Sequence, residues 1–97
     1  MSESARRTLR ILKAMRGKTL QGMTVTEIAQ STNESSVNIC RALDDLVAEG
    51  LVVKLDSGRY AHSIHILQIA TAHAAEIQRA TDRIQEINQR VHTGAFA

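Results

Sequence analysis

Residues 24–50 have the sequence TVTEIAQSTNESSVNICRALDDLVAEG, in which two helical segments are separated by a short polar turn. The first four residues form a capping box, in which the hydroxyl of Thr24 caps the amide of Glu27 and the glutamate side chain returns to the cap amide. A short helix is therefore predicted from about Val25 to Ser31. Asn33 comes next, and after glycine, asparagine best tolerates the left-handed backbone of a tight turn.

A longer helix is predicted from about Ser35 to Glu49, with Gly50 as its left-handed C-terminal cap. A short helix, a tight turn and a longer helix follow one another in the order of a helix-turn-helix. The residues that the longer helix is predicted to bury are Val37, Ile39 or Cys40, Leu43, Leu46 and Val47.

The flanking segments extend this motif on both sides. Before it, apolar residues at helical spacing predict a helix from about Glu3 to Arg16, which Gly17 ends. After it, the β-branched run over 51–55, the turn Asp56-Ser57-Gly58 and residues 59–62 predict a β-hairpin. A hairpin directly after a helix-turn-helix is the wing of a winged helix.

The C-terminal third predicts one long helix from Ser63 to about His92, followed by a frayed tail from Thr93 to Ala97. Its apolar residues alternate spacings of four and three, as in a coiled-coil seam, where a polar His73 would help to set the register. Such a seam needs a partner helix, most simply from a second copy of the chain. Isoleucine at both kinds of seam position favours more than two strands. The predicted oligomerisation residues are Ile66, Ala70, His73, Ile77, Ala80, Ile84, Ile87 and Val91.

The predicted fold class is therefore mainly α with a small β-hairpin. A winged helix-turn-helix DNA-binding domain is expected over residues 1–62, and a long coiled-coil-like dimerisation helix with its tail over 63–97. The 97 residues suit one such domain, and 43% hydrophobic with 23% charged residues is typical of a folded chain. No apolar run is long enough for a membrane, and the N-terminus lacks the apolar region of a secretory signal, so a cytoplasmic protein is expected.

Composition also argues against several kinds of site. Tyr60 and Phe96 are the only aromatic residues, too few to stack single-stranded bases, which leaves duplex as the nucleic-acid partner. The single Cys40 cannot form an internal disulfide and is expected to be a small buried hydrophobe. His62 and His65 lack the spacing and co-ligands of a metal site. No nucleophile, base and orienting group occur together, so the sequence predicts no enzyme, cofactor or metal.

A basic stripe is predicted on the first helix. Arg6, Arg10 and Lys13 fall at i, i+4 and i+7, on a different flank from the apolar residues. Residues 1–20 hold six basic side chains against the single acid Glu3, a balance that suits a polyanion such as DNA. The alternative is an ordinary solvated helix face.

The start of the longer helix carries the candidate base-contacting residues. Arg41 suits the acceptors of guanine and Asn38 the mixed edge of adenine in the major groove. Ser35 and Ser36, at the helix N-terminus, suit a phosphate. Acidic residues follow from Asp44 onward, so only the first two turns are expected to enter the groove. The alternative is that all four are ordinary solvated residues.

Two further cations flank the turn of the hairpin. Lys54 and Arg59 are placed where a wing contacts the DNA backbone or the minor groove. The alternative is a pair of surface charges that bridge Asp56.

The stretch from Thr24 to Tyr60 resembles the N-terminal winged helix of the IclR family of bacterial transcriptional regulators. The segments that carry the resemblance are RTLRILKAM, MTVTEIAQST, SSVNICRALDDLVAEGLV and DSGRY. The resemblance implies DNA binding and dimerisation. Family members usually carry a larger effector-binding domain after this one, which these residues do not contain, so no small-molecule effector is expected.

The chain departs from the family pattern where the recognition helix begins. Asn33, Glu34 and Ser35 stand where the family typically has a glycine, an apolar residue and a proline, and Ser36 occupies a position that is often basic. Arg41 fits an arginine that is frequent in the family. These departures bear on the operator sequence more than on the fold.

The predicted function is that of a sequence-specific transcription regulator that binds double-stranded DNA as a homodimer or a higher homo-oligomer. One alternative is a DNA-recognition subunit of a larger assembly, such as phage DNA packaging or replication. Another is a protein-interaction adaptor built on a winged helix, because a fold does not by itself determine function.

Overall fold

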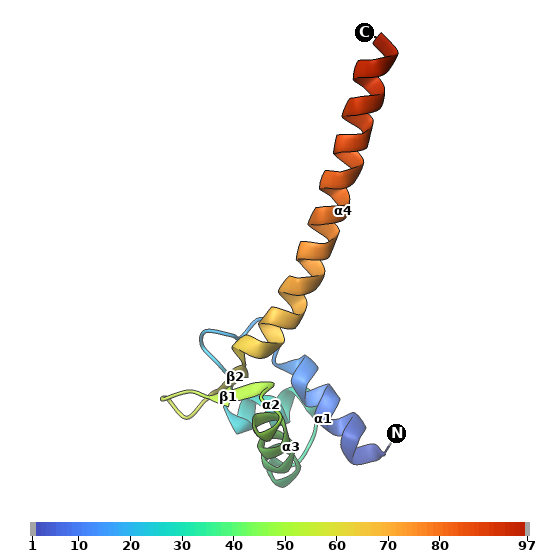
Figure 1. Ribbon diagram of the computed structural model, residues 1–97. Coiled ribbons are helices and arrows are strands. Elements are labelled where there is room, and N and C mark those ends of the chain that lie inside the picture. Colours follow the sequence, from blue (N-terminus) through green and yellow to red (C-terminus); the bar gives the residue numbers. More distant parts are fainter. Residues whose placement is uncertain (1, 97) are drawn as a thin grey trace. The chain divides into compact units, whose positions relative to one another are not determined.

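The computed structural model describes residues 2–96, which form four helices and a two-stranded sheet (Figure 1). The elements in chain order are α1 (Glu3–Ala14), α2 (Val25–Thr32), α3 (Ser36–Ala48), β1 (Val52–Lys54), β2 (Tyr60–His62) and α4 (Ile64–Phe96). They belong to two compact units that divide between Leu67 and Gln68. The predicted fold class, mainly α with a small hairpin and a long C-terminal helix, is confirmed.

Side-chain hydroxyls cap the helices of the first unit. Ser2 accepts a hydrogen bond from the amide of Ala5, Thr24 from that of Glu27, and Ser35 from that of Asn38. The threonine half of the predicted capping box is therefore present. The carboxylate of Glu27 instead accepts from Arg59 of the hairpin, so this side chain links α2 to the wing.

Left-handed residues end α2 and α3 as predicted. Asn33 has φ 58° and ψ 35°, and Gly50 has φ 75°. Beyond Gly50, the amide of Leu51 donates to the carbonyl of Leu46 at 2.9 Å, which completes a Schellman motif. These two positions fix where the chain turns into α3 and where it leaves it.

The core of the first unit lies between α1, α2, α3 and the base of the hairpin. Its largest fully buried side chains are Ile11, Met15, Ile28, Ile39, Leu43 and Val52. Val25 and Ala29 of α2 pack against this cluster while partly buried.

Part of the predicted buried face of α3 is wrong. Val37 is 60% exposed, Val47 is 41% exposed and Cys40 is exposed, whereas Ala42 is buried. Successive residues turn by about 100° around a helix, so Ile39, Ala42, Leu43 and Leu46 form one stripe and the three exposed residues lie outside it. The buried stripe is fixed by the packing of α1 and α2 against α3.

The hairpin is antiparallel, with Val52 opposite His62, Val53 opposite Ala61 and Lys54 opposite Tyr60. Met23, just before α2, extends the ladder through two 2.8 Å hydrogen bonds with Tyr60. Gly22 makes this approach possible, because a Cβ there would lie 2.9 Å from the carbonyl oxygen of Tyr60. The wing is therefore joined to the start of the helix-turn-helix.

The helix α4 is 33 residues long and, among the described residues, buries none of its side chains. It begins beside Ser63, whose hydroxyl caps the amide of Ile66. It continues to Phe96, so the predicted end near His92 and the frayed tail from Thr93 are wrong for residues 93–96, while Ala97 lies outside the described residues. Within residues 2–96, no helix is both long and apolar enough to cross a membrane.

Candidate nucleic-acid interface

The exposed face of α3 carries the main candidate for base contacts. Ser36 and Arg41 are exposed as predicted, while Asn38 is only half-exposed. By helical geometry Val37 lies on the same face as Arg41, with Cys40 beside them. Val37 and Cys40 were predicted to lie in the core, so this apolar part of the face, which can contact a thymine methyl group, was not predicted. Their spacing alone could not distinguish the two sides of the helix.

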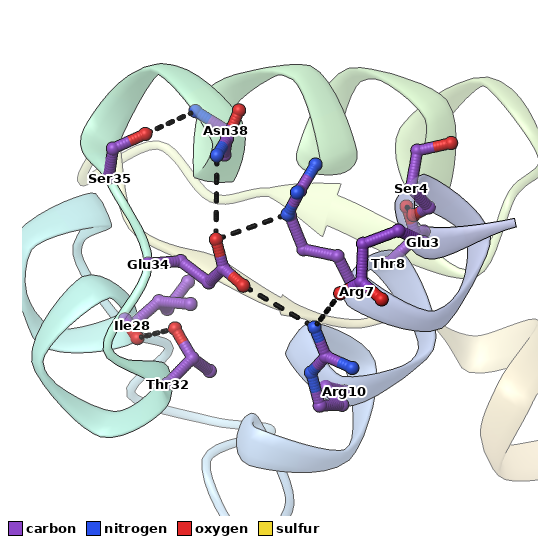
Figure 2. A network of polar contacts seen from close by, with 10 residues as sticks. All are labelled: Glu3, Ser4, Arg7, Thr8, Arg10, Ile28, Thr32, Glu34, Ser35 and Asn38. Carbon is purple, nitrogen blue, oxygen red and sulfur yellow. Dashed lines mark hydrogen bonds and ion pairs between the residues drawn. The ribbon is translucent and has the colours of Figure 1, made fainter.

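Asn38 lies on the flank of α3 that faces α1. Together with Arg41 it borders a small groove of about 190 Å³ between these helices, lined further by Ser4, Arg7, Thr8, Ala42 and Asp45. The side-chain amide of Asn38 donates to Oε2 of Glu34 at 3.4 Å (Figure 2). One Nδ2 proton of Asn38 is thereby used, and its Oδ1 and second Nδ2 proton remain for a base edge.

Glu34 is the centre of a polar network between α1 and the turn before α3. Its Oε2 lies 3.1 Å from Nε of Arg7, and its Oε1 accepts a 3.4 Å hydrogen bond from Arg10 (Figure 2). The Arg7 contact is an ion pair without the geometry of a hydrogen bond, which leaves a buried Nε held only by charge. The Glu34 side chain is 17% exposed. The turn of the helix-turn-helix is therefore tied to α1 by opposite charges.

Arg10 is not a free phosphate-binding cation. Besides Glu34, it donates to Oε1 of Glu3 at 2.8 Å. This hydrogen bond and the charge of Arg10 lower the pKa of the Glu3 carboxyl, and the same hydrogen bond raises the pKa of Arg10. Arg6 and Lys13 are exposed and form no ion pair within residues 2–96, so both side chains are available to an external anion.

The basic stripe opens onto a groove between α1 and α2. Arg10, Lys13 and Arg16 line it from α1 and the segment after it, and Ser31 and Thr32 line it from α2, around a volume of about 420 Å³. The hydroxyls of both α2 residues donate to carbonyls of their own helix. Arg16 was not among the predicted site residues, although it follows Lys13 by three positions and so lies near the same flank.

The two wing cations differ in their surroundings. Arg59 donates to Oε1 of Glu27 at 2.7 Å and to the carbonyl of Gly22 at 3.4 Å. Its acidic partner is therefore Glu27 and not Asp56. The ammonium of Lys54 lies 5.8 Å from the centroid of the Tyr60 ring and remains exposed. Arg59 thus ties the wing to α2, and Lys54 is the wing cation that is open to an external anion.

His62, His65 and His73 do not form a cluster that could bind a metal ion. Nε2 of His62 is 2.7 Å from the carbonyl oxygen of Leu12, while His65 and His73 are exposed on α4. In the part of the chain that the structure describes, no three His, Cys, Asp or Glu side chains lie close enough to hold a metal ion.

On α4, the predicted oligomerisation residues from Ala70 to Val91 are all exposed, and Ile66 is half-buried. The three isoleucines of the seam beyond it, Ile77, Ile84 and Ile87, are between 45% and 59% exposed. The helix therefore presents these apolar residues to solvent.

A capped helix-turn-helix followed by a hairpin that is bonded to its first segment defines the first unit as a winged helix-turn-helix. The chain belongs to the IclR family, since the model of the IclR helix-turn-helix domain matches residues 4–56. The resemblance seen in the sequence is confirmed. The fold and this match together define an IclR-type winged helix-turn-helix domain.

Two solved structures share this fold. HmgR from Pseudomonas aeruginosa has a TM-score of 0.64 and 23% identity over 73% of this chain and 29% of that chain. An IclR homolog from Microbacterium sp. strain HM58-2 has a TM-score of 0.65 and 16% identity over 79% of this chain and 32% of that one. The present chain thus spans less than a third of the length of either protein. No protein of curated function matches the sequence.

Proposed function

We propose that this chain is a sequence-specific regulator that places the first two turns of α3 in the major groove of double-stranded DNA. The observation that carries the proposal is the charge of this segment. Residues 35–43 contain no carboxylate, and the adjoining Glu34 is neutralised by two arginines. The first acid within α3 is Asp44, beyond the part that would enter the groove. A polyanion can therefore approach the N-terminal half of α3 without repulsion.

The predicted contact residues at the start of α3 have roles that suit their surroundings. Arg41, exposed and free of an ion pair in residues 2–96, would contact guanine, and Asn38 would offer its remaining amide atoms to adenine at the edge of the face. The oxygen of Ser35 already accepts from the amide of Asn38, so its hydroxyl proton is free to donate to a phosphate beside that of Ser36.

Backbone contacts would come from the predicted DNA-binding cations outside α3 that form no ion pair within residues 2–96. These are Arg6 and Lys13 on α1 and Lys54 on the wing. Arg10 and Arg59, paired with Glu34 and Glu27, would mainly hold the turn and the wing in place while adding positive potential. This divides the predicted DNA-binding residues into contacting and positioning groups.

The protein would act as a homo-oligomer through α4. Its seam of Ile66, Ala70, His73, Ile77, Ala80, Ile84, Ile87 and Val91 would pack against the same helix of a second copy. Pairing of copies doubles the DNA contacts, as is usual for helix-turn-helix regulators that bind two half-sites.

Selection from a fragment pool tests the proposal. The chain is incubated with sheared genomic duplex at two salt concentrations, and the retained fragments are sequenced. Enrichment of one short motif is expected, with retention that falls as salt rises. Salt-sensitive retention without enrichment would indicate a subunit of a larger assembly, and no retention at either salt concentration would indicate a protein-interaction adaptor. Both of these results would overturn the proposal.

A further inference from the structure

The seam of α4 combines large, small and polar side chains. Ile77, Ile84 and Ile87 are large and exposed, Ala70 and Ala80 are small, and His73 is polar. In a coiled coil of two strands, each seam residue packs in a layer with a seam residue of the other helix. The direction and register of the pair therefore decide whether small residues meet small or large ones.

A parallel pair in register matches this seam poorly. Each residue would face itself, so Ala70 and Ala80 would form two layers with little side-chain volume and the His73 imidazoles would meet in the seam. Small residues facing each other leave voids that lose packing contacts. The flanking positions add no attraction, because Glu76 would face Thr81 and Arg83 would face Asn88.

We propose that α4 pairs with α4 of a second copy in antiparallel orientation, with Ile77 of each helix opposite Ala80 of the other. In this register Ala70 faces Ile87, and His73 faces Ile84. Every alanine of the seam then packs against an isoleucine, and the imidazoles are separated from each other. The proposal rests on the proposed function in that it takes α4 as the surface that pairs two copies.

The charges beside the seam select the same register. Glu76 and Arg83 each directly precede a seam isoleucine, and residues at this position face each other across an antiparallel pair. Glu76 of each helix then lies opposite Arg83 of the other, which gives two attractive contacts by symmetry. A shift by one heptad in either direction would place Glu76 against Glu76, or Arg83 against Arg83.

Both charged side chains are available for such contacts. Within residues 2–96, neither Glu76 nor Arg83 forms an ion pair, whereas Glu86 and Arg90 of the same helix pair with each other at 2.6 Å. An available pair of opposite charge that matches only in one register is a common determinant of coiled-coil orientation.

The register also fixes the spacing of the two attachment points. At about 1.5 Å per residue, the two Leu67 residues, where the winged-helix units end, would lie about 35 Å apart along the helix pair. This is close to one turn of B-DNA, the common spacing of half-sites, at about 34–36 Å.

Charge reversal tests the register. Glu76→Arg and Arg83→Glu should each weaken self-association measured by sedimentation equilibrium, by about tenfold, because each places like charges opposite one another twice. An equimolar mixture of the two variants should associate as tightly as the wild type, since both cross-contacts become attractive. Asp82→Arg, with the same change of charge on the outer side of the helix, should change the dissociation constant less than about twofold.

Disulfide exchange tests the orientation independently. In a Cys40→Ser background, Ala70→Cys and Ile87→Cys are prepared separately, mixed in a glutathione buffer and analysed by mass spectrometry. The antiparallel pair predicts the mixed disulfide between the two variants and little disulfide from either variant alone. Homodisulfides of each variant alone would indicate a parallel pair and overturn the proposal.

Failure here can be told apart from failure of the DNA-binding proposal. A strictly monomeric wild type, or equal weakening by Glu76→Arg and Asp82→Arg, would overturn the pairing. The affinity of the full chain for duplex is measured separately by anisotropy with labelled DNA, and an absence of binding would contradict the proposed function alone.

Discussion

Replacement of Glu34 by glutamine should destabilise the winged-helix unit, although it keeps the size and shape of the side chain. The change removes the only negative charge that Arg7 contacts in residues 2–96. The side chain of Arg7 is 24% exposed and that of Glu34 is 17% exposed. It also weakens the acceptor for Arg10 and Asn38. Loss of a partner in a fully buried pair costs about 3–5 kcal/mol, and exposed pairs contribute about 0–1 kcal/mol.

The Glu34 network lies between these limits, with contacts of 3.1–3.4 Å, so we expect a loss of about 1.5 kcal/mol in the free energy of unfolding. For a domain of this size that corresponds to a fall in Tm of roughly 6–12 °C. Urea unfolding followed by tyrosine fluorescence measures it, because Tyr60 is the single tyrosine, there is no tryptophan, and Tyr60 lies in the wing.

Glu3→Gln is the matched control. It removes the same kind of charge from the same arginine cluster, but Glu3 is 63% exposed, so the unfolding midpoint should barely change. Equal effects of the two substitutions, or a Glu34→Gln midpoint equal to that of the wild type, would refute the claim that this network ties the turn to α1.

Three further outcomes are expected. Ile39→Ala should cost about 2–5 kcal/mol of stability, whereas Val37→Ala, at a 60% exposed position, should cost less than about 0.5 kcal/mol. Similar costs for the two variants, measured by urea unfolding, would contradict the assigned face of α3. Lys13→Ala should weaken binding to all duplexes alike and lower the salt slope of the affinity by about one, and a loss confined to one DNA sequence would refute a backbone role. Arg10→Ala should return the pKa of Glu3, followed by NMR, upward toward 4.5, because Arg10 is the main cause of its depression. Since the pKa of Glu3 is lower in the folded state, its contact with Arg10 stabilises the fold at a pH above the ordinary pKa, and this stabilisation is lost as the pH falls through the folded pKa. An unchanged pKa of Glu3 in the variant would contradict the pairing.

Local signals in the sequence were sufficient to predict most elements. The hydroxyl of Thr24, the left-handed Asn33 and the left-handed Gly50 each act on neighbouring backbone atoms, so their effect is visible within a few residues. The departures from the family pattern at the turn also have structural roles. Asn33 adopts the conformation that glycine would, Glu34 pairs with arginines of α1, and Ser35 caps α3.

Features that depend on distant segments could not be predicted. Arg10 and Glu34 are 24 positions apart, and Arg59 and Glu27 are 32 apart, so no local pattern indicated these two ion pairs. The exposure of Val37 and Cys40 likewise follows from how α1 and α2 pack on α3, because apolar spacing alone allowed both sides of the helix.

The proposed function depends most on base contact by Arg41 of α3. The most direct test compares wild type and Arg41→Ala by fluorescence anisotropy on the duplex enriched from the fragment pool and on a scrambled duplex of equal length. We expect the variant to lose about 1–3 kcal/mol on the enriched duplex, roughly 5- to 150-fold in Kd, and much less on the scrambled one. Equal losses on the two duplexes would show that Arg41 contacts only the backbone and would contradict the account.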